Sequence, residues 1–145
     1  MKNFLISLAF LVPSAWAEVV VSHAQVREAI PGAPNTAAFM TLENRSEQAV
    51  RIVRAESDLA KRVELHTHTH DDGVMRMREV DAIEIPQGER VQLKPGGLHV
   101  MFLGLNQRVK QGDQINFDLI TESGTRIPVS AEVKKIQPMQ HGKKH

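Results

Sequence analysis

The sequence contains no cysteine and no tyrosine, and its single tryptophan, Trp16, lies among the first seventeen residues. Without cysteine there are no disulfides, and zinc-thiolate sites, iron–sulfur clusters and blue-copper centres, which all need a thiolate, are excluded. The chain also lacks an excess of charge of one sign, because it has 18 basic and 17 acidic residues. This balance argues against nucleic acid or an anionic membrane surface as the main partner.

The N-terminal segment has the three parts of a secretory signal peptide. Lys2 supplies a positive charge, Phe4 to Val12 form an apolar run, and Ala15-Trp16-Ala17 form a small-x-small cleavage site. The apolar run is too short to be a stable bilayer anchor. We therefore expect residues 1–17 to be cleaved, and the mature chain to start at Glu18 and lie in the periplasm without a membrane span.

The following part, up to residue 136, consists of short β-rich segments separated by turn residues. No helical period of 3.6 residues persists over more than two turns, and many short strands at regular spacing are typical of an antiparallel β-sandwich. The roughly 128 residues of the mature chain suffice for one core. We predict strands at 19–26, 37–43, 50–55, 63–67, 74–80, 83–85, 90–93, 98–103, 114–121 and 126–134.

Histidine and methionine gather within residues 65–105, which hold four of the seven histidines and three of the six methionines. Successive side chains of a strand alternate between its faces, so His99 and Met101 lie on the same face. Imidazole and thioether groups suit Cu(I), whereas carboxylate and carbonyl groups suit Mg, Ca or Mn. Asp71-Asp72-Gly73 is typical of a tight hairpin turn that precedes the strand carrying the other two methionines.

Each of these residues also has an ordinary structural use. Methionine is commonly a core filler, and Met40 is our example of that role. Met75 and Met77 share a strand face that is either core or site, and His99 also fits an interior histidine with its hydrogen bonds satisfied. Taken singly, each residue favours the structural role. The joint pattern of two histidines and two methionines, in an exported chain without cysteine, favours a metal site.

The spacing His66-x10-Met77-x21-His99-x-Met101 resembles the signature of the periplasmic copper chaperones called PCuAC. The resemblance implies a cupredoxin-like, Greek-key β-sandwich over residues 18–136 in which these four residues bind Cu(I). It also implies delivery of the copper towards cytochrome c oxidase. The flanking segments that resemble the family are residues 35–40, 64–66, 72–77 and 93–101.

Some histidines and methionines lie outside the four-residue motif. Residues 137–145 are polar and are expected to form a flexible tail. Family members with Met/His-rich C-terminal extensions take up a second copper ion, so we count the tail residues as secondary metal candidates. Zinc or nickel binding through His66, His68 and His70 is a further alternative. The secondary candidates are His68, His70, Met139, His141 and His145.

The predicted ligands are all neutral, so a bound Cu(I) keeps its positive charge and no thiolate stabilises Cu(II). No nucleophile with its base, or paired acid and base, is recognisable, and we expect a monomeric carrier and not an enzyme. The carrier would bind one Cu(I) and pass it to a respiratory oxidase copper centre or a Sco-type chaperone. A periplasmic copper buffer is the alternative. Binding should weaken as pH falls through the histidine range, at about 6.5.

Overall fold

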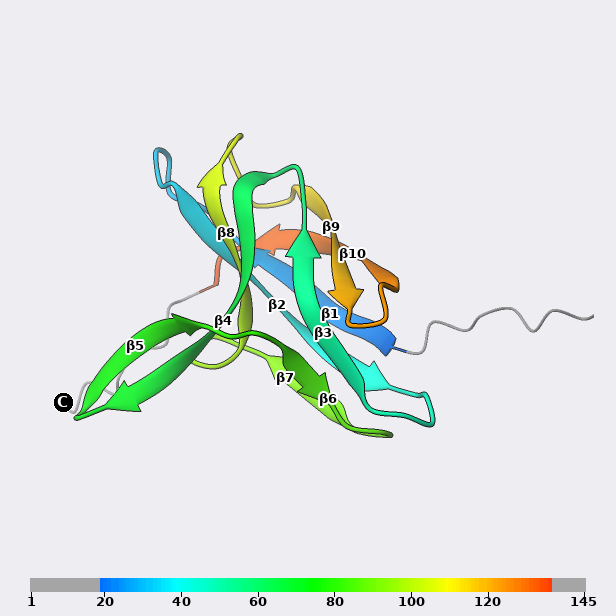
Figure 1. The fold of residues 1–145 in the computed structure, drawn as a ribbon. Coiled ribbons are helices and arrows are strands. Elements are labelled where there is room, and N and C mark those ends of the chain that lie inside the picture. Colours follow the sequence, from blue (N-terminus) through cyan, green and yellow to red (C-terminus); the bar gives the residue numbers. More distant parts are fainter. Residues whose placement is uncertain (1–18, 137–145) are drawn as a thin grey trace, which may run out of the picture.

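The computed structural model describes residues 19–136, and within this range the chain forms ten strands and no helix (Figure 1). Accordingly, none of the described residues belongs to a helix that could cross a membrane. The predicted signal peptide and tail, with Met139, His141 and His145, lie outside the described residues. The strands are β1 (Val19–Arg27), β2 (Asn35–Asn44), β3 (Val50–Glu56), β4 (Ala60–Asp71), β5 (Val74–Glu79), β6 (Ile83–Ile85), β7 (Arg90–Leu93), β8 (His99–Leu105), β9 (Gln114–Thr121) and β10 (Arg126–Lys134).

The strands form one continuous hydrogen-bonded ladder in the order β5-β4-β8-β2-β1-β10-β9-β3-β6, with β7 pairing to β2. Neighbours are antiparallel except for β1 and β10, which run parallel. The ladder curls so that β8 faces β9. This is evident from Phe102 on β8 and Phe117 on β9, whose rings meet edge to face with 5.4 Å between their centroids. The predicted β-sandwich is confirmed, with one parallel pair that the sequence did not indicate.

The core lies inside the curled sheet, between the facing parts of the ladder. It is formed by every second residue of the strands, because successive side chains point to opposite faces. In β10, for example, alternate residues from Ile127 to Val133 are buried and those between them are exposed. Met40 is 2% exposed and belongs to the core cluster, as expected for a methionine that serves as filler. The inner face therefore supplies the packing, and chemistry is left to the outer face and the edges.

The main difference from the predicted strands is β4, which was expected over 63–67 and extends from Ala60 to Asp71. Pairing with β5 explains the extension, because Arg78 on β5 forms a 2.8 Å ion pair with Asp71 and also donates to Thr69. The predicted turn follows, with positive φ at Asp72 (52°) and Gly73 (79°), as in the type I′ turns of tight hairpins. The histidine run is therefore part of a strand, which fixes the direction of each side chain.

Candidate metal centre

Cross-strand pairing gathers histidine and methionine side chains from three strands on one face of the sheet. His66 on β4 lies directly opposite His99 on β8, and His68 lies opposite Met77 on β5. Directly paired residues point to the same face, with Cβ atoms about 5 Å apart. We call this surface the His/Met face. We use the name for six of its residues, and His70, opposite Met75, continues the same face at its exposed end. The six members are His66, His68, Met75, Met77, His99 and Met101.

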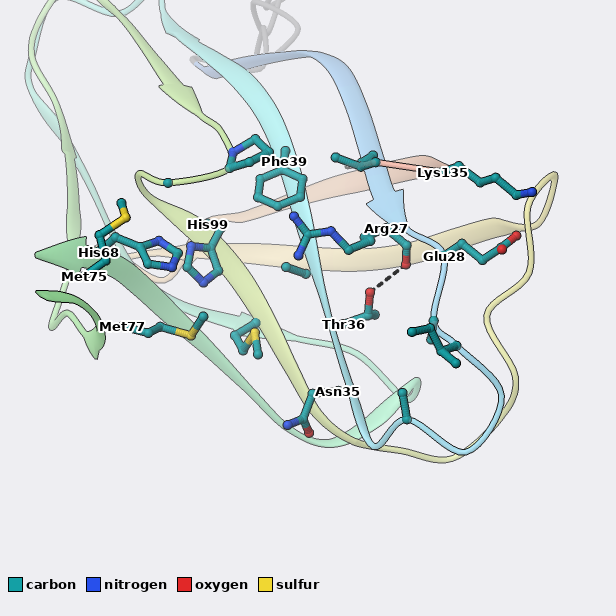
Figure 2. A pocket seen from close by; sticks show the side chains of 18 residues that line it. Arg27, Glu28, Asn35, Thr36, Phe39, His68, Met75, Met77, His99 and Lys135 are labelled. Atoms are coloured by element: carbon teal, nitrogen blue, oxygen red, sulfur yellow. Dashed lines mark hydrogen bonds between the residues drawn. The ribbon is translucent and has the colours of Figure 1, made fainter. Parts of the chain in front are cut away.

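An open pocket of about 700 Å³ lies over this face (Figure 2). Five of the six members of the His/Met face line it, namely His68, Met75, Met77, His99 and Met101. The sixth, His66, lies beside the pocket, with its ring 5.8 Å from that of His99. Phe39 and Arg27 line another part of the wall, where the Arg27 guanidinium lies 5.2 Å from the Phe39 ring centre. The structure thus brings all four motif residues to one place.

His99 is the most deeply buried of the polar residues in this pocket, with 1% of its surface exposed. Its Nδ1–H donates to the Gly97 carbonyl oxygen at 3.0 Å, while its Nε2 has no hydrogen-bond partner among residues 19–136. Burial lowers the pKa of His99 to about 4, and this outweighs the Gly97 hydrogen bond, which raises it. His99 is therefore neutral near pH 7, and Nε2 holds a lone pair that faces no internal donor.

His66 is oriented by a carboxylate that the sequence analysis did not single out. Its Nε2–H donates to Glu64 Oε2 at 2.7 Å, and Arg62 lies 3.6 Å from the other carboxylate oxygen. A carboxylate on one ring nitrogen fixes the tautomer and makes the other nitrogen a better metal ligand. The sequence did contain one indication of this contact. Glu64 lies two residues before His66 on a strand, so the two side chains share a face.

Glu64, His66 and Glu79 also place one ligand atom each within 4.8 Å of one another. This group differs from the predicted site, because it is rich in oxygen and Glu79 is exposed. Glu64 already accepts the His66 hydrogen bond through Oε2. We interpret the two carboxylates as partners and negative neighbours of the His66 ring.

His68 lies inside the pocket, although the sequence placed it among the secondary candidates. Figure 2 shows the His68 ring beside that of His99. The two ring centres are 5.2 Å apart, whereas the ring centre of His66 is 5.8 Å from that of His99. His70, two residues further along β4, is exposed and is not among the pocket-lining residues. The structure therefore does not group His66, His68 and His70 as one three-histidine site, since His99 takes the place of His70.

Buried polar atoms without a hydrogen-bond partner are concentrated in this region. The described part of the chain has four buried side-chain nitrogens without a hydrogen-bond partner, and three of them are His66 Nδ1, His68 Nδ1 and His99 Nε2. We call these three atoms the open nitrogens. The fourth is Nε of Arg27, in the wall of the same pocket. Buried polar atoms are normally paired, so this concentration indicates a site for an external ligand.

The thioethers complete the donor set. Met77 is 44% exposed, which is unusual for a large apolar side chain in this molecule, and Met75 and Met101 are half-buried. The Met75/Met77 face therefore lines the pocket and is not part of the core. Neutral imidazole and thioether groups suit a soft metal ion of low charge. Fold and pocket together define a β-sandwich domain with a pocket lined by imidazole and thioether groups.

Comparison with known proteins places the chain in a family. A family model described as LpqE-like putative lipoprotein matches residues 19–133, so the chain belongs to the LpqE-like family. Putative lipoprotein Lxx21020 of Leifsonia xyli is 34% identical over 117 residues, which cover 80% of this chain and 69% of the relative.

Two solved structures have the same fold. Cu(I)-bound DR1885 from Deinococcus radiodurans is 36% identical with a TM-score of 0.67, covering 85% of this chain and 82% of that one. The copper-bound PCuAC domain from PmoF2 gives a TM-score of 0.69 at 21% identity, covering 84% of this chain and 97% of that domain. These matches confirm the resemblance to PCuAC domains and the cupredoxin-like fold.

Proposed function

We propose that this protein is a periplasmic copper carrier that binds one Cu(I) through His66, Met77, His99 and Met101. It passes the ion to a copper-accepting protein, either a respiratory oxidase copper centre or a Sco-type chaperone. The observation that carries the proposal is the convergence of open nitrogens and thioethers at one pocket. The copper named for the structures of DR1885 and of the PmoF2 domain supports the choice of metal.

The ligand chemistry suits a carrier better than an enzyme or an electron shuttle. Two imidazoles and two thioethers bring no negative charge to the ion, so the reduced, monovalent state is favoured. Met77 is 44% exposed and lies on a strand at the edge of the ladder. An acceptor's sulfur or nitrogen can therefore approach the ion from the solvent side and replace one thioether at a time.

The first test is a Cu(I) titration of the mature protein against a chromophoric chelator, under anaerobic and reducing conditions. We expect one equivalent to bind, with weaker binding in His99→Ala and in Met101→Leu. His70→Gln is the matched control, because His70 is an exposed histidine of the same strand outside the pocket. If the wild-type protein fails to compete with the chelator, the copper function is wrong.

A copper buffer remains a second candidate, because the face holds more ligand groups than one Cu(I) needs. Deleting the gene separates the two. Loss of a carrier lowers the copper content of the oxidase, whereas loss of a buffer raises copper sensitivity and leaves the oxidase loaded.

A further inference from the structure

The wall of the pocket on β1 and β2 contains a cation without a counter-ion. Nε of Arg27 is buried and has no hydrogen-bond partner among residues 19–136. Neither Arg27 nor Lys135, the other cation of the wall, takes part in an ion pair of that range. Glu28 lines the same wall, but its carboxylate accepts the backbone N–H of Gln111 at 2.8 Å. Since buried polar groups are normally paired, the partner of Arg27 must come from outside this range.

The register of the sheet places Arg27 in line with Met101. Val26 on β1 pairs with Ala38 on β2, so the next residue, Arg27, lies across from Ala37. Ala37 in turn pairs with Met101 on β8. With neighbouring strands about 4.8 Å apart, the Arg27 and Met101 backbones are separated by about 10 Å, and only a methyl side chain stands between them. A molecule that contacts Arg27 therefore also lies beside the thioether of Met101.

Arg27 is held in place before any partner arrives. The Thr36 hydroxyl donates to its carbonyl oxygen at 2.6 Å, which fixes the end of β1. Its guanidinium lies 5.2 Å from the centre of the Phe39 ring, and Figure 2 shows it on the side of His99 that faces away from Met75. Burial lowers the pKa of Arg27, but an arginine stays charged at neutral pH. A partly buried charge attracts an opposite charge more strongly than one in water does.

The rim of the pocket is apolar and exposed. Three large apolar side chains are exposed in the described part of the chain, and they are Ile30, Val74 and Met77. Two of the three, Ile30 and Met77, line this pocket, and Ile30 is 77% exposed. Exposed apolar groups around a desolvated arginine are typical of a surface that binds another protein.

We propose that this pocket is the docking site of the copper-accepting protein, and that Arg27 pairs with a carboxylate that lies between apolar side chains of that protein. The inference rests on the proposed carrier function and adds the chemistry of the partner. Residues 137–145 of this chain do not supply the missing charge, because they include Lys143 and Lys144 and no acidic side chain. Pairing at Arg27 sets the register of the docked partner, so that its ligand groups reach Met101 and Met77.

The direct test uses two blocked tripeptides as probes, acetyl-Leu-Glu-Leu-amide and its counterpart with glutamine in the centre. Each is titrated into the apo protein and followed by nuclear magnetic resonance. We expect the glutamate peptide to shift the Arg27 Nε–H resonance and to bind about tenfold more tightly than the glutamine peptide, as a charge-assisted hydrogen bond provides. In Arg27→Met, which keeps the apolar stem, the two peptides should bind equally.

Matched variants keep the test specific. Arg76→Met removes an exposed arginine of β5 that does not line the pocket, and the preference for the glutamate peptide should remain about tenfold. Arg27→Lys keeps the charge without the planar fork and should retain part of the preference, which covers the case that methionine disturbs the wall. Circular dichroism checks the fold of each variant.

A second measurement follows the copper itself. Cu(I) transfer from the loaded protein is timed with the soluble domains of the two proposed acceptors, the oxidase copper centre and the Sco-type chaperone. Arg27→Met should slow transfer about tenfold to whichever domain accepts copper from the wild-type protein. The Cu(I) affinity of the variant should stay within about threefold in the chelator titration, because the fault lies in docking and not in binding the ion.

The outcomes separate the two proposals. Equal binding of both peptides to the wild-type protein overturns the docking inference. So does acetate binding as tight as that of the glutamate peptide, which would indicate a small-anion site, and so does a dimer in sedimentation that Arg27→Met dissociates, which would assign the pocket to a second copy. If the wild-type protein prefers the glutamate peptide but fails to bind Cu(I), the carrier function is wrong and Arg27 serves a partner that takes no copper.

Discussion

Two buried polar side chains show how this molecule separates its scaffold from its site. Asn44 at the end of β2 and His99 at the start of β8 are each 1% exposed. Asn44 uses every polar atom it has. Its amide donates to the carbonyl oxygens of Gln48 at 2.8 Å and Ile85 at 2.9 Å, and its oxygen accepts from the backbone N–H and hydroxyl of Ser46. His99 pairs one nitrogen and keeps the other open.

Burial alone therefore does not tell the two roles apart, whereas pairing does. A buried group with all its partners stabilises the fold, and removing it leaves those partners unsatisfied. A buried group with an open lone pair weakens the apo fold and gains its partner when a ligand binds. The Asn44 corner should thus control stability, and the His/Met face should control metal affinity.

The largest expected effect is on metal affinity at His99. His99→Ala removes a proposed ligand, and because loss of a residue that only orients a ligand costs 10–100-fold, we expect Cu(I) affinity to fall by about a hundredfold or more. Anaerobic chelator competition measures this change. The urea midpoint of the apo protein should also fall, because truncating this fully buried side chain leaves a cavity, but the variant should remain folded. A variant that unfolds outright would show that His99 is also structural.

Asn44→Ala should have the opposite profile. The change removes the Asn44 donor to the Ile85 and Gln48 carbonyl oxygens, and of the two only Gln48 keeps another side-chain donor, the Ser46 hydroxyl at 2.7 Å. We expect a loss of about 3 kcal/mol in the free energy of unfolding. Urea denaturation followed by circular dichroism is suitable, because residues 19–136 contain no tryptophan or tyrosine. Cu(I) affinity should be retained.

Ser46→Ala is the graded control for the corner. It removes one of the two donors to Asn44 and keeps the other, so the expected loss is about 1 kcal/mol. If Asn44→Ala weakened Cu(I) binding as strongly as His99→Ala, the division between the corner and the site would be wrong.

The pH dependence of the apo protein should reveal the burial of His99. Its pKa is about 4 in the folded protein and about 6.5 when unfolded, so the unfolded state binds the proton more readily between these values. The contribution of neutral His99 to the free energy of unfolding is therefore fully present above about pH 6.5. It is lost as pH falls, by up to about 3 kcal/mol at pH 4.

Urea midpoints measured from pH 7 to pH 4 check this expectation. In the His99→Gln variant, the urea midpoint should fall less steeply between pH 7 and pH 4 than in the wild-type protein. Equal slopes in the variant and the wild-type protein would show that His99 is hydrated in the apo state and titrates normally.

The smallest expected effect on metal affinity is at Glu64. Glu64→Gln keeps a hydrogen-bond acceptor for the His66 ring but removes the charge, and we expect about a tenfold loss of Cu(I) affinity in the chelator titration. Glu79→Gln is the control, because Glu79 is exposed and makes no contact with the His66 proton. An equal loss in both variants would indicate that the carboxylates themselves bind the metal.

Local patterns in the sequence were enough to predict most of the fold. Arg126–Lys134, which alternates strictly, and Gln114–Thr121, which alternates over its first six residues, were predicted with the bounds that the structure has. The Asp72-Gly73 turn was recognisable because few residues adopt positive φ at both positions. The shared face of His99 and Met101 followed from the period of two.

The parts that the sequence did not predict depend on register between distant strands. Nothing local to β4 shows that His66 pairs with His99, 33 positions away, or that His68 therefore reaches the pocket and His70 does not. Polar residues in a strand were taken as the end of the strand, although here they pair with β5. Glu64 was treated as a flanking residue because its hydrogen bond to His66 is a tertiary detail.

The position of β5 at the end of the ladder has a consequence for kinetics. Among the described strands β5 bonds to β4 alone, through six residue pairs, whereas β8 is held by ladders on both sides. Edge hairpins open locally at a fraction of the global unfolding free energy, so amide protons of β5 should exchange with solvent faster than those of β8. Met77 can therefore move away while His99 and Met101 stay in place. In the proposed copper site, the opening rate of the β4–β5 hairpin then sets an upper limit on how long a bound ion stays enclosed.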